Sequence, residues 1–410
     1  MLRKQSDLFT TFYTLPFMPH SVPITWNPDT HQASFDEQSI KKTNFLYYLH
    51  TSALILMLIQ LMLDTETSNF TKLPTFFSVI CLIMQNLYLH IGRIHNHDIV
   101  LYINGLFQLM ERQERIEIKS HRRVIEPKMN ILEILNRLFA YALKITVTLT
   151  PLVFVYGLHW SDSNKSSLVG SVMLKYGKIN METEDTLKTS VKMILKVFLF
   201  LFNHYLWAAG LYALAVFMNW FHNLGTFILR CSLKKYLHNC LHNGKVYPTA
   251  QETLVYREIQ VLSILNNIIN QTVIFVLTTG VIFLLALCLT ATIRLEWHME
   301  HMLAVAFFGI ISIDCFLFLL VCVGGMVGPY VESRKALETL KRQHPSSGFA
   351  RRGSRYSFRW LQRYVKSCFL IKVKMGKDNF LEELTPLNCV NLAISVTVNI
   401  LLLTVSHKEP

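Results

Sequence analysis

The chain has 410 residues, of which 51% are hydrophobic and only 16% are charged, and its mean hydropathy is +0.32. In soluble domains about a quarter of all residues are charged, so this composition argues against a water-soluble enzyme or binding domain. The formal net charge of +13 would suit a nucleic-acid binder, but the basic residues gather between long apolar blocks. These blocks predict a membrane protein, and we expect no nucleic-acid partner.

Seven stretches are long and apolar enough to cross a bilayer, which needs about 20 residues of helix. They are, in chain order, 44–63, 73–94, 138–158, about 189–218, 271–293, 302–330 and about 380–405. The fourth and sixth are longer than a crossing requires, so we expect them to continue into water at one end. The predicted fold class is therefore an all-α membrane protein with seven transmembrane helices.

The distribution of lysine and arginine predicts the orientation of these helices. The N-terminal segment and the segments after the second, fourth and sixth spans together hold 29 basic residues. The segments on the opposite side, including the C-terminal tail, hold only 7. We therefore expect a cytoplasmic N-terminus and an extracellular C-terminus.

Glycosylation sequons agree with this orientation. Asn69 and Asn164 each begin an Asn-x-Ser/Thr sequence in one of the two longest predicted extracellular loops, where glycosylation is possible. All eight cysteines fall in spans or on the predicted cytoplasmic side, so we expect no extracellular disulfide.

The cytoplasmic segments continue the helices of the membrane part. Apolar residues at helical spacing follow the fourth span and precede the fifth, and a short amphipathic helix is predicted over 354–368. Exposed apolar faces need a partner, so we expect an anchor or oligomerisation region. The predicted divisions are a cytoplasmic segment 1–43, spans one to four 44–218, cytoplasmic extensions 219–270, spans five and six 271–330, a cytoplasmic loop with the short helix 331–379, and the last span with its tail 380–410.

The last span carries a row of polar side chains. At about 100° per residue, five of them fall on one face of the helix: Thr385, Asn388, Asn391, Ser395 and Asn399. In lipid an unpaired amide is costly, so this face must meet protein or water. Either it hydrogen-bonds to other helices or it lines a wet pore, and the row by itself is consistent with both. If it lines a pore, Leu402 and Leu403, near the outer end, would form a hydrophobic gate.

A small organic ligand would suit the outer halves of spans three to six, where aromatic residues mix with a few polar ones. Lys196 and Asp314 are ionisable residues inside predicted spans, which makes them site candidates. The candidate ligand-binding residues are Phe154, Tyr156, Lys196, Phe198, Phe202, Tyr205 and Asp314.

Histidines raise an alternative, a membrane-bound metalloenzyme. His90-Ile-Gly-Arg-Ile-His95 is similar to the first histidine box of membrane di-iron desaturases, but the two later boxes are absent. Cys231, His238, Cys240 and His242 fit no zinc spacing. We therefore expect neither enzymatic activity nor a metal or other cofactor.

The layout as a whole resembles the insect-type chemoreceptors, the gustatory and odorant receptors of arthropods. The shared features are seven spans, a cytoplasmic N-terminus, protruding spans four to six, a short helix before the last span, and a last span close to the C-terminus. The stretch from Ser367-Cys368 through Lys374, Gly376 and Phe380 to Asn399 is similar in spacing to the family's C-terminus. The usual Thr-Tyr and Gln-Phe motif of gustatory receptors is absent from span seven, which indicates a divergent member.

The resemblance implies a chemosensory receptor in the plasma membrane that is a ligand-gated, non-selective cation channel. Four subunits, identical or mixed with a co-receptor, would place four copies of the last span around a central pore. Each subunit would hold a small organic ligand among its spans and contact membrane lipid. A membrane protein whose polar row only packs helices is the alternative that stays open.

Overall fold

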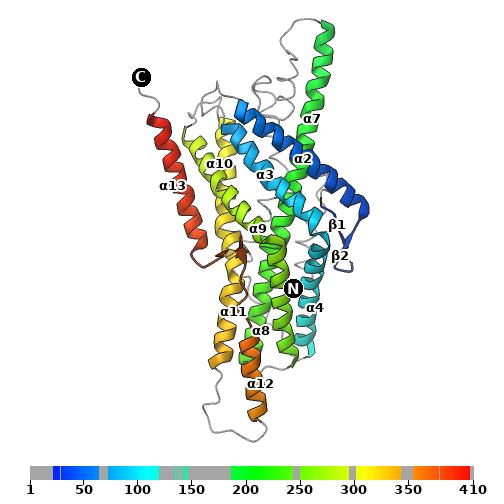
Figure 1. The fold of residues 1–410 in the computed structure, drawn as a ribbon, viewed down its shortest axis with the longest axis vertical. Coiled ribbons are helices and arrows are strands. Elements are labelled where there is room, and N and C mark those ends of the chain that lie inside the picture. The colour runs from blue at the N-terminus through cyan, green and yellow to red at the C-terminus, as the bar shows by residue number, and fades with distance from the viewer. Residues whose placement is uncertain are drawn as a thin grey trace.

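A computed structural model describes residues 22–27, 29–63, 73–119, 186–242, 250–294, 302–342, 354–377 and 379–406, with single helical positions at 134, 138, 141, 144 and 145. Long helices run roughly along one axis of an elongated molecule (Figure 1). Six helices in the described part are long and apolar enough to cross a membrane. The predicted third span, 138–158, lies outside the described residues except at four of those single positions.

Three helical rods form the centre of the molecule. The first joins α7 (Thr186–Phe217), the π-helical segment η1 (Met218–Gly225) and α8 (Thr226–His242). The second is α9 (Ala250–Arg294), whose 45 residues span about 68 Å, roughly twice a bilayer core. The third joins α10 (Met302–Leu317), η3 (Phe318–Val323) and α11 (Gly324–Arg342). The expected protrusion of spans four to six is present as continuous helix.

Aromatic side chains fill the core where the first rod turns π-helical. Tyr88 stacks on Phe217 with ring centroids 5.5 Å apart, and its hydroxyl lies 2.9 Å from His222 Nε2. Tyr102 stacks on Phe221 at 5.2 Å, and all of these rings are buried. π-Helical turns change the direction of side chains relative to an α-helix, and here both ring stacks and the Tyr88–His222 contact lie in one core.

The first two spans are α2 (Glu37–Leu63) and α3 (Leu73–Ile94), which pack against each other. The second agrees with its predicted range. The first begins seven residues earlier than predicted, because Asp36 caps the helix: its carboxylate accepts hydrogen bonds from the N–H groups of Gln38 and Ser39.

The segment after the second span contains a helix that the sequence analysis did not predict. Asn96–Lys119 forms α4, which packs on α8 and α9 through a buried face that includes Tyr102, Leu106 and Met110. The second half of this helix is rich in charged residues, so its sequence does not show the long apolar stretch by which a span is recognised.

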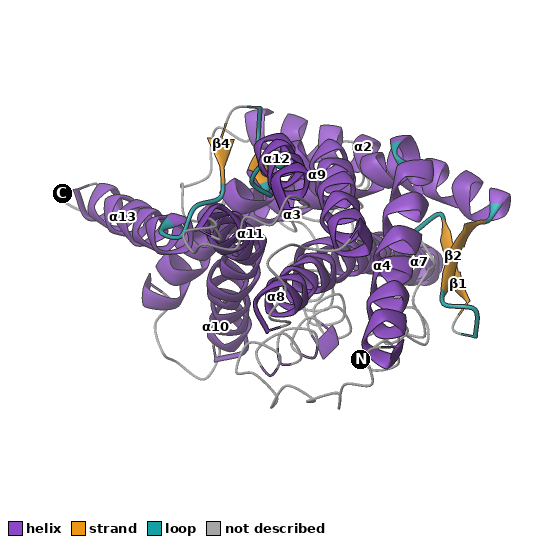
Figure 2. Ribbon diagram, turned by 90° about the horizontal axis from the view of Figure 1, so that it is seen from below, coloured by secondary structure: helices purple, strands orange, loops and turns teal. Residues whose placement is uncertain are grey.

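The predicted cytoplasmic segment 1–43 contains a hairpin that the sequence did not predict. Strands β1 (Ile24–Asn27) and β2 (Gln32–Phe35) pair antiparallel, with Ile24 opposite Phe35. Asn104 of α4 holds β2 with both ends of its amide: its Oδ1 accepts from the Ala33 N–H at 2.7 Å, and its Nδ2 donates to the Ala33 carbonyl at 3.0 Å. The hairpin is thereby fixed to the side of the bundle (Figures 1 and 2).

The C-terminal part begins with the expected short amphipathic helix, α12 (Ser354–Ser367), at the lower end of the molecule in Figure 1. A short hairpin follows, formed by the two-residue strands β3 (Lys374–Met375) and β4 (Asn379–Phe380), with Gly376 at φ +74° in its turn. The last helix, α13 (Thr385–Ser406), therefore starts five residues later than the predicted span. Thr385 closes the turn before it by accepting a hydrogen bond from the Glu382 N–H at 2.8 Å.

Candidate functional site

The last helix lies at the edge of the bundle, where α9 and η3 support it (Figures 1 and 2). Only 22% of its apolar stretch is buried, against 78% for the stretch that begins at Leu201. Its buried side chains are Cys389, Val390, Ala393 and Thr397. At about 100° per residue they fall on one narrow face, so most of the helix surface is free of the bundle.

The polar row lies on the side of α13 opposite this packed face. Asn388, Asn391, Ser395 and Asn399 are exposed, and Thr385 is half-buried. The Ser395 hydroxyl donates to the Asn391 carbonyl at 2.9 Å, which satisfies it within its own helix. Within the described part of the chain, the side-chain amides of the three asparagines make no hydrogen bond. A single copy of the chain therefore leaves the row to be covered by water or another chain, because lipid would leave the amides unpaired.

The predicted gate leucines follow directly on from the polar row. Leu402 is 63% exposed and Leu403 67% exposed. From the N-terminal to the C-terminal end of α13, its exposed face therefore changes from amides and a hydroxyl to two leucines. Immediately before them, the carbonyl of Leu401 accepts a hydrogen bond from Arg294 of α9, 3.0 Å from Nη2.

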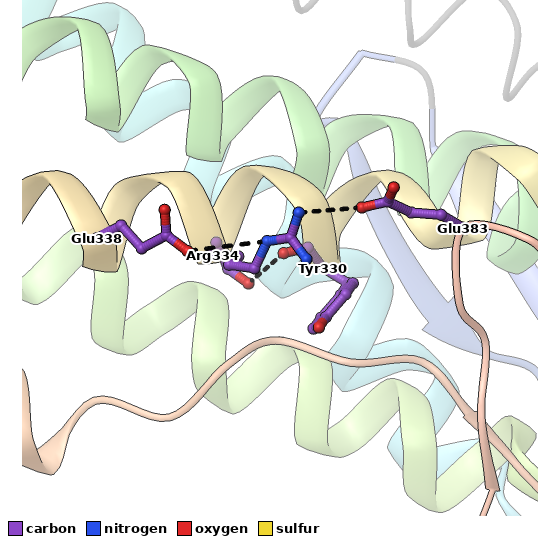
Figure 3. Close-up of polar contacts among 5 residues, drawn as sticks. Tyr330, Arg334, Glu338 and Glu383 are labelled. Atoms are coloured by element: carbon purple, nitrogen blue, oxygen red, sulfur yellow. Dashed lines mark hydrogen bonds and ion pairs between the residues drawn. The ribbon is translucent and has the colours of Figure 1, made fainter.

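A charged cluster connects the N-terminal end of α13 to α11 (Figure 3). Arg334 Nη2 lies 3.3 Å from the carboxylate of Glu383, and its Nε lies 4.0 Å from Glu338 one turn further on. The guanidinium also lies over the Tyr330 ring at 5.7 Å. The neighbouring Glu382 is exposed. Arg334 thus offsets the charge of Glu383, and Glu382 presents its carboxylate to solvent.

The β3–β4 hairpin braces the same end from the other side. Lys372 Nζ lies 5.3 Å from the Tyr330 ring and 4.6 Å from the Phe380 ring. The Gly376 N–H donates to the Gln271 carbonyl of α9 at 2.7 Å. The start of α13 is therefore fixed to both α9 and α11, the cytoplasmic continuations of spans five and six in the predicted topology.

Comparison with known proteins agrees with this arrangement. No family model and no curated protein matches the sequence. Solved structures do match, among them the insect olfactory receptor OR5 from Machilis hrabei in complex with eugenol and the same receptor without it. Each superposes with a TM-score of 0.62 at 10% sequence identity, over 98% and 97% of this chain and 97% and 96% of the receptor.

The chain has the fold of an insect olfactory receptor. The expected resemblance to insect-type chemoreceptors is thus confirmed, over nearly the whole length of both chains. Both of these matched structures are olfactory receptors.

Within this olfactory-receptor fold, the candidate ligand residues are placed only in part. Phe154, Tyr156 and the side chain of Lys196 lie outside the described residues. On α7, Phe198 is 61% exposed, Tyr205 is 45% exposed, and the rings of Phe198 and Phe202 stack with centroids 6.5 Å apart. Asp314 is half-buried on α10. Because α7 packs on α2 and α3 while α10 packs on α9, the described residues of this set come from separate helix pairs. The sequons at Asn69 and Asn164 also lie outside the described residues.

The two histidines of the stretch similar to a histidine box, His90 and His95, both contact neighbouring side chains. His95 Nδ1 lies 3.0 Å from Asp98 Oδ2 at the elbow between α3 and α4. His90 packs on Tyr47 with ring centroids 5.3 Å apart, and Arg93 lies over the same ring at 4.6 Å. Among the described residues, no three histidine, cysteine, aspartate or glutamate side chains come together in a way that could hold a metal ion.

One pair of buried polar side chains had no signal in the sequence. Gln85 of α3 and His50 of α2, both fully buried, meet at Gly210 of α7. A Cβ at Gly210 would lie within 3 Å of Gln85 Oε1 and of His50 Cε1. The three residues come from three helices far apart in the chain, so only the tertiary structure reveals that the glycine makes room for the two polar side chains.

Proposed function

We propose that this chain is a subunit of a chemically gated, non-selective cation channel in the plasma membrane, with α13 of each subunit lining a central pore. The observation that carries the proposal is the polar row of α13, which is exposed and lies opposite the face that packs on the bundle. Four copies around an axis would turn these rows toward one another and enclose a wet path. Neutral amide and hydroxyl dipoles suit partly hydrated cations without strong selectivity.

Charges near α13 support a preference for cations. The pore-lining set, Thr385, Asn388, Asn391, Ser395 and Asn399, carries no charge of either sign. At its inner end the exposed Glu382 adds a carboxylate from each copy, which raises the local concentration of cations. Leu402 and Leu403 form the gate in this proposal, because a ring of leucines excludes water when it is narrow.

The chemical signal in this proposal is a small organic molecule. The structurally similar receptor from Machilis hrabei was solved with eugenol, which is such a molecule. We infer that a ligand of this class binds in the outer part of the subunit, near Phe154, Tyr156, Lys196, Phe198, Phe202, Tyr205 and Asp314. The proposal further includes a cytoplasmic N-terminus, an extracellular C-terminus, and assembly as a homotetramer or with a co-receptor. Whether the chain serves taste or smell does not affect these features.

Labelling of single cysteines tests the pore. Asn391→Cys, Ser395→Cys and Asn399→Cys should each react with a charged, hydrophilic thiol reagent in the full chain reconstituted in nanodiscs, as read by mass spectrometry. Leu387→Cys and Ile394→Cys are the matched controls, because both side chains are exposed on α13 but lie off the polar row. Facing lipid, they should stay unlabelled, since the thiolate that reacts is not stable there.

Recordings of ionic current provide a second test of the pore. In cells that express the chain, eugenol serves as the probe, and the reagent should block the evoked or spontaneous cation current only in the three row variants. If the row cysteines label no faster than those at 387 and 394, the polar row packs against protein and the channel proposal fails. The protein would then be a membrane protein of the same fold without a pore along α13.

A further inference from the structure

Arg93, near the end of α3, packs on two tyrosines of α2. Its Nη1 donates to the Tyr48 hydroxyl at 3.0 Å, and its guanidinium lies over the Tyr47 ring at 4.6 Å and the Tyr48 ring at 5.6 Å. Among the described residues, no carboxylate lies within ion-pair distance of Arg93. The guanidinium is thus oriented by aromatic contacts, keeps its positive charge, and has further N–H donors beyond the one that Tyr48 accepts.

This contact lies where two spans reach the same boundary of the membrane. The sequence predicts that the first span begins at 44 and the second ends at 94, so Tyr48 and Arg93 both fall within roughly one turn of that boundary. Tyrosine favours the headgroup level because its ring is apolar and its hydroxyl is polar. In the predicted topology this is the cytoplasmic side, whose leaflet contains the anionic phospholipids.

A second cation and an apolar strip lie on the adjoining surface of α2. Lys41, Tyr48, Ile55 and Met62 are all exposed and recur every seven residues, so they lie on one face of the helix. From the boundary into the membrane, this face changes from a cation to an aromatic ring and then to apolar side chains. A phospholipid has the same order of chemistry, from its phosphate to its acyl chains.

We propose that this face of α2, together with Arg93, binds an anionic phospholipid of the cytoplasmic leaflet. The Arg93 guanidinium donates to the lipid phosphate, which its planar fork fits, and Lys41 adds a second positive charge. Ile55 and Met62 contact the acyl chain. A soluble phosphate would make only the polar contacts, so a lipid is the favoured occupant. This inference uses the orientation given in the proposed function but requires no pore.

Native mass spectrometry of the purified full chain in detergent tests the site, with phosphatidylserine as the probe. Wild type should retain more phosphatidylserine than phosphatidylcholine, whose headgroup carries no net charge. Arg93→Gln should reduce retention of phosphatidylserine about fivefold, the effect of one cation near an anionic lipid. Arg115→Gln is the matched control, because it removes the same charge from α4, where Arg115 already pairs with Glu111. Equal retention by wild type and Arg93→Gln would overturn the proposal.

A second pair of variants keeps the test valid if Arg93→Gln does not fold. Lys41 and Lys42 are both exposed, but Lys42 lies about 100° around the helix from the lipid-binding face. Lys41→Gln should therefore weaken retention of phosphatidylserine several-fold more than Lys42→Gln. Equal effects of the two would show a diffuse attraction to positive charge and would overturn the site.

Thermal unfolding distinguishes the lipid from a free anion. Phosphatidylserine should raise the melting temperature of wild type in detergent, because a ligand of the folded state stabilises it, and should raise that of Lys41→Gln less. Sodium phosphate should leave both melting temperatures unchanged. If sodium phosphate stabilised wild type as strongly as the lipid does, a soluble anion would be the ligand and the proposal would fail. A chain that retains the lipid but conducts no cations would keep this inference and lose the pore.

Discussion

Gly210 illustrates how one residue decides whether two membrane helices can approach a third. Its missing Cβ leaves the space that Gln85 and His50 occupy, and both side chains are fully buried. Gly210→Ala should therefore destabilise the fold by about 1–3 kcal/mol, the usual cost of overpacking, in spite of the better helix propensity of alanine. Gly309→Ala is the control, because a Cβ there meets nothing within 4 Å. It should leave the melting temperature in detergent unchanged or raise it; a loss in both variants would contradict the proposed role of the space at Gly210.

Asp36 gives a prediction on pH. The pKa of its carboxyl lies below the ordinary value of 3.8, first because the Ser39 hydroxyl donates to it and then because the Gln38 N–H does so. A lowered pKa in the folded state means that the ionised carboxylate stabilises α2 above pH 3.8, and that this contribution is lost as the pH falls through the lower, folded value.

The corresponding variant is Asp36→Asn, which keeps a capping amide oxygen but cannot ionise. The melting temperature of the wild type should exceed that of Asp36→Asn at pH 6, and the difference should shrink as the pH falls toward 3. A difference that is constant between pH 3 and pH 6 would show that the charge of Asp36 does not contribute.

At the scale of elements, Asn104 of α4 contributes two hydrogen bonds to the attachment of the β1–β2 hairpin. Asn104→Leu removes both hydrogen bonds to Ala33 and leaves a partly buried N–H and carbonyl without partners, at a cost of about 1–3 kcal/mol. Hydrogen exchange over residues 32–35 should rise accordingly. Thr25→Ala is the control, since the Thr25 hydroxyl bonds to Ser34 on the exposed side of the hairpin. If both variants exchange alike, contacts other than those of Asn104 hold the hairpin.

The helices were predictable from the sequence to the extent that each carries its own pattern. The apolar length of α3 and the aromatic spacing of α12 are local, and both predictions agree with the structure. The four-residue strands of the β1–β2 hairpin are too short for a periodic signal, and α4 is polar in its second half. For α13, the sequence predicted a polar row, but which side packs on the bundle depends on α9 and η3. Likewise the sequence shows Arg294 only as a basic residue at the end of a span, and its hydrogen bond to Leu401, 107 residues away, is visible only in the structure.

At the scale of the whole molecule, the inner half of α9 presents a row of apolar side chains that needs a partner. Leu254, Val261, Ile264 and Ile268 are all exposed and recur at intervals of seven, three and four residues. In the predicted topology this half lies in the cytoplasm, where such a row favours contact between subunits. The chain mass of 47.6 kDa gives a tetramer of about 190 kDa.

Val261→Glu tests this contact. A charge in the centre of the row should reduce the fraction of tetramer at least about tenfold, because an unpaired charge in an apolar interface is costly. Light scattering in detergent measures the protein mass of the assembly. Leu101→Glu is the control, since Leu101 is equally exposed but lies on α4. A tetramer that survives Val261→Glu would place the subunit contact elsewhere, and a wild-type monomer would remove the assembly altogether.

The unbroken length of α9 has a mechanical consequence. A helix of 45 residues acts as a lever about 68 Å long, with one arm among the membrane spans and the other below them. A tilt of about 5° near its outer end would displace its inner end by about 6 Å, more than one helical turn. Helix α9 contacts α13 at Leu401 and the β3–β4 hairpin at Gln271. A small rotation of α9 would therefore displace both ends of α13 together.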